Sequence, residues 1–211
     1  MHQVFIANPK GGCGKTTIST QLAGYFAKNN FRVILMDHDA QKSSSDWVRG
    51  RPKTSAKIKV IASKEVESLP DTGAADIVIH DMPAAWSLDH VASIIQKGDK
   101  VLIPVLSSPN DIKACIRFIM GLNRSGVMDN DIEIGLIGNR VKSRTKYATV
   151  LQDFLEHLEL PIISSLRDTQ NYVKAMDEGK TVFDLAPSKA KKDIEDWNPI
   201  LHWLGFSQHA H

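Results

Sequence analysis

The segment Lys10–Thr17 reads KGGCGKTT, and it stands between a short apolar run and a helix-forming run. Gly11, Gly12 and Gly14 permit unusual backbone dihedrals, and they let N–H groups approach an anion without a Cβ in the way. The helix that follows adds the free N–H groups and the partial positive charge of its N-terminus. The segment therefore predicts a phosphate-binding loop, and with it a P-loop NTPase type of fold.

The other residues of this loop also have expected contacts. Lys15 would reach the β- and γ-phosphates, and Thr16 would place its hydroxyl on Mg²⁺. Thr17 is expected to bond the α-phosphate, and Cys13 belongs to the backbone cradle around the phosphates. The loop therefore predicts a nucleotide with several phosphates, bound together with Mg²⁺.

The rest of the chain alternates short apolar runs with helical stretches. The expected strands are Gln3–Ala7, Arg32–Asp37, Ile58–Ala62, Asp76–Asp81, Lys100–Pro104 and Ile132–Ile137. The expected helices are Lys15–Asn29, Trp86–Gln96, Asp111–Ser125, Thr145–Leu158, Asp168–Glu178 and Pro187–Leu204. Most strands are continuous β-branched or leucine-rich runs, as strands buried on both faces require. This alternation predicts an α/β fold, a doubly wound and mostly parallel sheet flanked by helices, with ligands at the carboxyl ends of the strands.

Length and composition predict a single domain over residues 1–211. A chain of 211 residues can bury a sizeable core but is short for two domains. The hydrophobic fraction of 42% is ordinary for a soluble protein, and no apolar run reaches the roughly 18 residues of a membrane span. Two cysteines cannot form a disulfide framework, which predicts a cytoplasmic protein. A net charge of +2 confines any nucleic-acid binding to a local patch.

The loop resembles the deviant phosphate loop of the ParA/MinD family, whose pattern is K-G-G-x-G-K-[ST]. Pro9 stands where a strict G-x-x-x-x-G-K-[ST] pattern needs glycine, and Lys10 stands five positions before the loop lysine. Three further segments resemble the family in order and spacing: Asp37–Gln41 (DHDAQ), Asp76–Pro83 (DIVIHDMP) and Val101–Pro109 (VLIPVLSSP). Ala40 and Ala84 replace prolines that are usual in the family, which changes loop stiffness more than chemistry. The resemblance covers most of the chain.

This resemblance implies that Lys10 crosses a dimer interface and touches the nucleotide of the partner subunit. A cation supplied in trans neutralises charge in the phosphoryl-transfer transition state, as arginine fingers do for about 10³–10⁵-fold in rate. It also couples ATP binding to homodimerisation, because the lysine finds its counter-charge only in the dimer. Asp39 lies just past the end of its strand and is the candidate for orienting or activating the attacking water. Lys10, Lys15 and Asp39 are therefore the expected catalytic residues of a Mg²⁺-dependent ATPase.

Two more carboxylates are expected near Mg²⁺. Asp81 ends an apolar strand and would hold the ion through water, since Mg²⁺ keeps several waters and takes few carboxylates. Asp37 would support the Mg²⁺ shell or the adjacent loop, and helix N-capping is the alternative role for Asp37 and Asp39. His80 is expected to be a packed neighbour rather than a catalytic base. The expected metal-ligating set is Thr16, Asp37 and Asp81.

Ile132–Val141 reads IEIGLIGNRV and resembles the adenine-contacting end of a later strand of the family. An amide both donates and accepts hydrogen bonds, which suits the N6 and N7 edge of adenine. Asn139 and Arg140 are therefore expected at the base, with an ordinary turn asparagine as the alternative. No N-K-x-D sequence stands there to favour guanine, so the expected cofactors are ATP and Mg²⁺.

Two basic runs are candidate DNA contacts. The first holds Arg140, Lys142, Arg144 and Lys146, and the second holds Lys189, Lys191 and Lys192. Resemblance to ParA-type partition ATPases implies sequence-independent DNA binding, which needs only cations along one face; a solvated surface is the alternative. The implied function is an ATP-bound homodimer on the nucleoid that partitions a plasmid or other DNA cargo. A ParB-like or small centromere-binding adaptor protein would stimulate its ATP hydrolysis.

Other functions stay open. Positioning of a non-DNA cargo, such as an organelle or a protein array, keeps the whole mechanism and changes only the partner. A MinD-like membrane regulator needs a terminal amphipathic helix with a basic polar face, and Pro187–Leu204 fits that requirement poorly. A small-molecule ATP-dependent ligase would use the same fold with a substrate pocket and no response to DNA. An iron–sulfur role would need metal-ligand spacing, which Cys13 and Cys115 lack.

Overall fold

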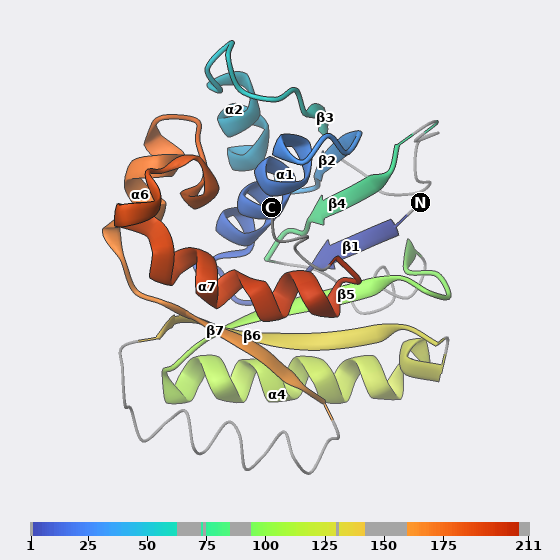
Figure 1. Cartoon of the computed structure of the whole chain (residues 1–211). Helices are drawn as coiled ribbons and strands as arrows, with labels where there is room; N and C mark the ends of the chain where they lie inside the picture. The colour runs from blue at the N-terminus through green and yellow to red at the C-terminus, as the bar shows by residue number, and fades with distance from the viewer. Residues whose placement is uncertain are drawn as a thin grey trace.

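The computed structural model describes residues 2–62, 73, 75–84, 94–129, 131–141 and 160–206. In this part of the chain, seven strands form one sheet in the order β3-β2-β4-β1-β5-β6-β7 (Figure 1). All neighbouring strands are parallel. The strands are β1 His2–Ile6, β2 Val33–Asp37, β3 Lys59–Ala62, β4 Ile77–Asp81, β5 Lys100–Leu106, β6 Glu133–Val141 and β7 Ile162–Arg167. The expected doubly wound parallel sheet is confirmed.

Helices cover both faces of this sheet, as Figure 1 shows. They are α1 Lys15–Lys28, α2 Ser43–Arg49, α4 Pro109–Arg124, α6 Gln170–Asp177 and α7 Pro187–Trp203, with short 3₁₀ turns η1 Val127–Asp129 and η2 Val182–Asp184. One core cluster joins the apolar sides of α1 and α7 to the sheet, and a second joins α4 to the opposite face. Strands β2 and β4 are buried at every position, which explains why both are apolar up to the polar residues at their carboxyl ends.

Two elements differ from the sequence-based expectation. The strand β7 was not expected, because Ser164 and Ser165 interrupt its apolar pattern; as an edge strand it is only partly buried and tolerates them. The helix α2 was not expected either, since its SSSDWVR sequence has low helix propensity. Two expected helices, Trp86–Gln96 and Thr145–Leu158, lie largely or wholly outside the described residues.

The terminal helix α7 closes over the sheet. Its apolar residues Trp197, Ile200 and Leu201 are buried in the same cluster as α1, and the indole Nε1 of Trp197 donates to the Tyr172 hydroxyl at 3.0 Å. The apolar side of this helix is therefore occupied by the protein itself. Among the described helices, none combines the length and the apolar content needed to cross a membrane.

A close backbone contact connects the end of α2 to the turn after α6. Gly179 has φ of 65°, and a Cβ there would lie 2.6 Å from the carbonyl oxygen of Gly50 and 2.8 Å from Cα of Arg51. The Arg51 guanidinium also donates to the Gly179 carbonyl at 3.2 Å. Only glycine satisfies both the dihedral angle and the space.

We expect Gly179→Ala to lower the free energy of unfolding by about 2–4 kcal/mol, because backbone strain and a backbone clash add together. Gly98→Ala is the matched control: Gly98 has φ of 85° but open space around it, so the strain alone would cost about 1 kcal/mol. Denaturant unfolding of the two variants measures both values. Equal losses would contradict the contact.

Candidate nucleotide-binding site

The loop between β1 and α1 has the geometry of an anion cradle. Gly12 and Gly14 adopt φ values of 75° and 100°, which other residues rarely take. A Cβ at Gly14 would lie 2.0 Å from the amide nitrogen of Asn139. No side chain caps the N-terminus of α1, and no acidic residue stands in its first turn. The N–H groups of that turn are therefore left for a ligand.

Two asparagines hold this loop against the neighbouring strands. The Asn8 amide donates to the Pro104 carbonyl on β5 at 2.7 Å, and its oxygen accepts the Lys10 N–H at 2.8 Å. The Asn139 amide donates to the Cys13 carbonyl at 2.8 Å, and its oxygen accepts the Arg140 N–H at 3.0 Å. Both side chains are buried. The loop is thus fixed by hydrogen bonds from the strands on its side of the sheet.

The two lysines of the loop have different surroundings. Lys15 is buried, and its Nζ donates to the Lys10 carbonyl at 3.1 Å, across the space that the loop encloses. The Lys10 side chain is 45% exposed, and its Nζ lies 4.0 Å from Asp111 Oδ1 at the start of α4. Lys10 is therefore held by its own chain but remains open to solvent, which suits a residue expected to reach another subunit.

The carboxylates meet beside the loop at the carboxyl ends of β2 and β4. Asp37 pairs with Asp81 in the strand register, and Ile6, the last residue of β1, pairs with Asp81 as well. Asp37 Oδ1 accepts the Asp39 N–H at 3.1 Å, and its Oδ2 accepts the Ser45 N–H at 2.8 Å. Asp37 therefore supports the following loop and α2. Asp39 remains partly exposed, with Oδ1 accepting the Gln41 N–H at 2.9 Å.

Asp81 is suited to a cation. It is buried, Oδ1 accepts from the Ser19 hydroxyl at 3.2 Å, and Oδ2 has no hydrogen bond within the described residues. Burial raises its pKa to about 6, with a contribution from the charge of Asp37, while the hydroxyls of Thr16, Ser44 and Ser19 lower it. A buried carboxylate oxygen without a partner, beside a threonine hydroxyl, fits the water-rich shell of Mg²⁺.

His80 has a structural environment, as expected. Its ring stacks on Phe5 with centroids 4.0 Å apart, and its nitrogens lie 3.0 Å from His38 and 3.2 Å from Gln3 Oε1. Burial lowers its pKa well below the usual value, and the neighbouring His38 adds to this shift. The imidazole is therefore neutral and part of the packing under the carboxylates.

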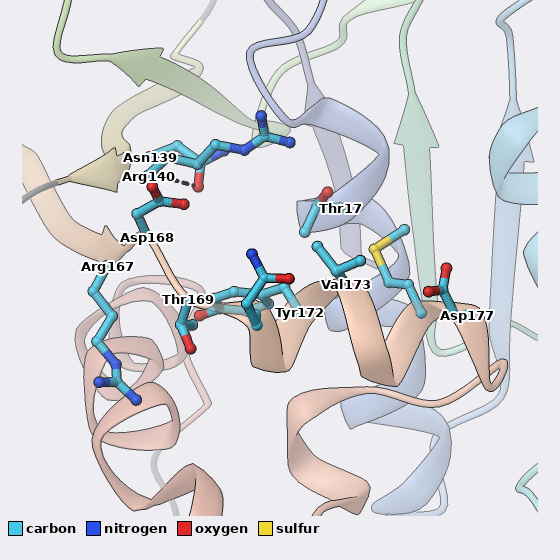
Figure 2. A pocket seen from close by; sticks show the side chains of 11 residues that line it. Thr17, Asn139, Arg140, Arg167, Asp168, Thr169, Tyr172, Val173 and Asp177 are labelled. Atoms are coloured by element: carbon cyan, nitrogen blue, oxygen red, sulfur yellow. Dashed lines mark hydrogen bonds between the residues drawn. The ribbon is translucent and has the colours of Figure 1, made fainter.

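A cavity of about 410 Å³ adjoins the loop, and Figure 2 shows the side chains that line it, among them Thr17 of α1 and Val173 of α6. Asn139 and Arg140 line its β6 side, and residues 167–170 line the side that connects β7 with α6. Val173 is 50% exposed and offers an apolar surface of the kind that a base can cover. The cavity begins at Thr17, the last residue of the loop. A nucleoside attached to phosphates in the loop would extend into it.

The structure brings most expected site residues to one edge of the sheet. These are the loop residues 10–17, Asp37, Asp39, Asp81, Asn139 and Arg140. The basic side chains Lys142, Arg144 and Lys146 lie outside the described residues, whereas Lys189, Lys191 and Lys192 are exposed on the first turns of α7, away from this loop in sequence.

Sequence reasoning missed Asn8, Asp111 and the contribution of α6. Asn8 stands directly before Pro9 and Lys10, so its position after a strand was a signal for loop anchoring. The α6 residues follow a strand that was itself missed, and the polar run Arg167-Asp168-Thr169 at its end was the available signal. Asn139 was expected at adenine; its amide instead binds the loop backbone, and its contact with a base stays a prediction.

Comparison with known proteins places this geometry among nucleotide-binding domains. A family model described as the CobQ/CobB/MinD/ParA nucleotide binding domain matches residues 4–182. The chain is 30% identical over 203 residues to the Maintenance of carboxysome distribution protein A of Halothiobacillus neapolitanus, covering 93% of both chains. It is 32% identical over 205 residues to the protein of the same name from Gloeobacter kilaueensis, covering 95% of this chain and 93% of that one.

A solved structure shares the fold along the whole chain. It is the ATP complex of a Cyanothece McdA variant, with a TM-score of 0.76 and 18% identity, covering 100% of this chain and 99% of that one. The order and direction of the strands described above therefore occur in a protein that holds ATP.

We expect Asn139→Ala to weaken the affinity for ATP by about tenfold or more, because the loop carbonyl of Cys13 loses its donor. The ratio of ATP to GTP affinity would stay unchanged if Asn139 acts through the loop. Fluorescent analogues of both nucleotides measure the two affinities. A lost preference for ATP, with little change in GTP affinity, would show instead that Asn139 reads the base.

Proposed function

Because the chain belongs to the CobQ/CobB/MinD/ParA nucleotide-binding domain family, we propose that it is a Mg²⁺-dependent ATPase that positions a cargo inside the cell. The observation that supports this most directly is the loop with two lysines. Lys15 is directed into the loop, while Lys10 is exposed beside it. The first lysine serves the chain's own nucleotide, and the second is available to a partner subunit.

In the proposed reaction, two chains associate when each holds ATP. The loop N–H groups and Lys15 bind the phosphates, and Lys10 leaves Asp111 to neutralise charge on the nucleotide of the partner subunit. Thr16 and Asp81 would hold Mg²⁺, which supplies charge neutralisation on the phosphates. Asp39, held through its backbone by Asp37, orients the attacking water. After hydrolysis the cross-subunit contact is lost and the dimer separates.

The relatives favour a non-DNA cargo over a plasmid. Two proteins that align over nearly the whole chain, at 30% and 32% identity, are named for maintaining carboxysome distribution. We therefore propose a large protein assembly as the cargo, which was the alternative expectation from the sequence, and an adaptor protein bound to that assembly. Non-specific DNA on the nucleoid is the proposed track, with Lys189, Lys191 and Lys192 as candidate contacts because all three are exposed on α7.

A membrane track is less consistent with the structure. Membrane-surface helices keep an apolar face free for the lipid, whereas α7 buries Trp197, Ile200 and Leu201 against the sheet. We also propose that the chain is a single ATPase domain that acts in the cytoplasm, as its composition predicts.

We expect Lys10→Ala to bind ATP normally but to stay monomeric, because only the dimer uses this side chain. The variant would also lose the ATP-dependent, salt-sensitive binding to double-stranded DNA that we expect of the wild-type protein. Light scattering and DNA co-sedimentation with ATP measure both properties. Lys15→Ala would lose nucleotide binding itself, and Lys113→Ala, an exposed lysine on α4, is the control. A Lys10→Ala dimer of normal strength would refute the in-trans role.

The nature of the cargo is testable in the cells that carry the gene. Deletion of the gene is expected to make protein assemblies cluster while plasmids are retained over generations. Fluorescence imaging of labelled assemblies and plasmid-loss counts measure the two outcomes. Complementation with Asp39→Ala is the control, because a dimer that cannot hydrolyse ATP would not restore the distribution. Plasmid loss together with evenly distributed assemblies would contradict a protein cargo and favour a DNA cargo.

A further inference from the structure

A second cavity lies between the end of α2 and the start of β3. Its volume is about 480 Å³, and all residues that line it come from the segment between Val48 and Ile58. The apolar part of the lining is made by Val48, Pro52, Ala56 and Ile58. Three cations, Arg51, Lys53 and Lys57, also line it, and no acidic residue does. The result is a surface groove that combines apolar contact area with positive charge.

Within the residues that the structure describes, no carboxylate forms an ion pair with the cations that line this groove. Residues 47–64 contain six lysines and arginines and no acidic residue. Lys53 and Lys57 are exposed, and neither they nor Arg51 forms an ion pair within the described residues. By contrast, the nearby Arg49 is paired with Asp46 at 2.9 Å. A groove with cations and no carboxylates is complementary to an anionic ligand.

Arg51 is held in place by an aromatic ring and two carbonyls rather than by an ion pair within the described residues. Its guanidinium lies 4.6 Å above the Trp47 ring and donates to the carbonyls of Gly179 at 3.2 Å and Ala56 at 3.3 Å. Its Nε is buried and has no hydrogen bond within the described residues. Burial lowers its pKa, and the charge of Asp184 only partly opposes this. An arginine fixed in this way loses little freedom when a carboxylate binds.

We propose that this groove docks an acidic segment of a partner protein that also carries apolar side chains. The apolar lining is the reason to prefer a protein segment to nucleic acid, since DNA phosphates would use the cations but leave the exposed parts of Val48, Pro52 and Ala56 uncovered. An acidic segment with leucine-like side chains uses both parts of the surface. The inference rests on the proposed function, because it assigns a docking surface to the adaptor that stimulates hydrolysis.

The groove is connected to the catalytic loop by one short helix. Its wall is the C-terminal end of α2, whose N-terminal turn is bonded to Asp37 through the Ser45 N–H. Seven residues of helix span about 10 Å, and Asp39 lies just before this helix. A segment bound to Arg51 therefore acts on a helix whose first turn shares the Asp37 carboxylate with Asp39, the residue expected to orient water. The contact between Arg51 and Gly179 extends the connection to α6, which lines the nucleoside cavity.

The test uses the full chain with ATP and a fluorescent dodecapeptide of sequence EELEELEELEEL. We expect it to bind at low ionic strength and to raise the rate of ATP hydrolysis. The double variant Lys53→Glu/Lys57→Glu would weaken binding by about tenfold or more, whereas Lys53→Arg/Lys57→Arg would retain it. The control Lys113→Glu/Arg124→Glu makes the same change of charge at exposed positions on α4 and would leave the affinity unchanged. An all-glutamate dodecapeptide would bind more weakly, because it lacks apolar side chains.

Three results would overturn the proposal. The first is no binding of the peptide, and the second is equal affinity for the wild-type protein and Lys53→Glu/Lys57→Glu. The third is a loss of double-stranded DNA affinity in that variant with unchanged peptide binding, which would make the groove a nucleic-acid surface. Binding without a change in hydrolysis would overturn the connection through α2. Dimerisation and basal hydrolysis of the wild-type protein in the same samples test the proposed function separately.

Discussion

The rest of the site depends on one steric constraint, the close approach of Gly14 to the Asn139 amide. The helix α1 can start with free N–H groups only if the preceding loop turns sharply, and the positive φ values of Gly12 and Gly14 provide that turn. Asn139 then fills the space that a Cβ would occupy and donates to the loop at Cys13. The loop, β6 and the cavity beside Thr17 are thus fixed relative to one another by one buried amide.

The parallel sheet explains why the carboxylates are at the same place. Because β1, β2 and β4 run in one direction and end at the same level, the phosphate loop, Asp37 and Asp81 meet at one edge. Asp37 uses both oxygens on backbone N–H groups, so its role in the described structure is to hold the Asp39 loop and α2. Asp81 keeps a buried oxygen that has no hydrogen bond from the residues that the structure describes. Two carboxylates of similar sequence context therefore have different chemistry.

Contacts between distant segments connect this edge to the surface. The Asp37 bond to Ser45 fixes the start of α2, and the end of α2 meets Gly179 and the groove beside Arg51. Lys10 stays near Asp111 until another negative charge competes for it. We therefore propose two surfaces at which a second chain acts on the nucleotide site, one at Lys10 and one at the groove. At the first surface, Lys10 lies 4.0 Å from Asp111; at the second, Arg51 is bonded to two neutral carbonyls.

The amino-acid sequence was sufficient to predict the phosphate loop, six of the seven described strands and the carboxylates at the strand ends. These features are local, since apolar runs and glycine spacing act over a few residues. It did not predict α2, because the serine-rich sequence has low helix propensity and the helix is supported by tertiary contacts, a hydrogen bond to Asp37 and the burial of Trp47. It did not predict β7, since an edge strand tolerates Ser164 and Ser165. Three features required the folded structure: Asn139 holds the loop, α6 lines the cavity, and cations surround an apolar groove. The first two join segments that are far apart in the chain, and the third depends on how the segment between α2 and β3 folds back on itself.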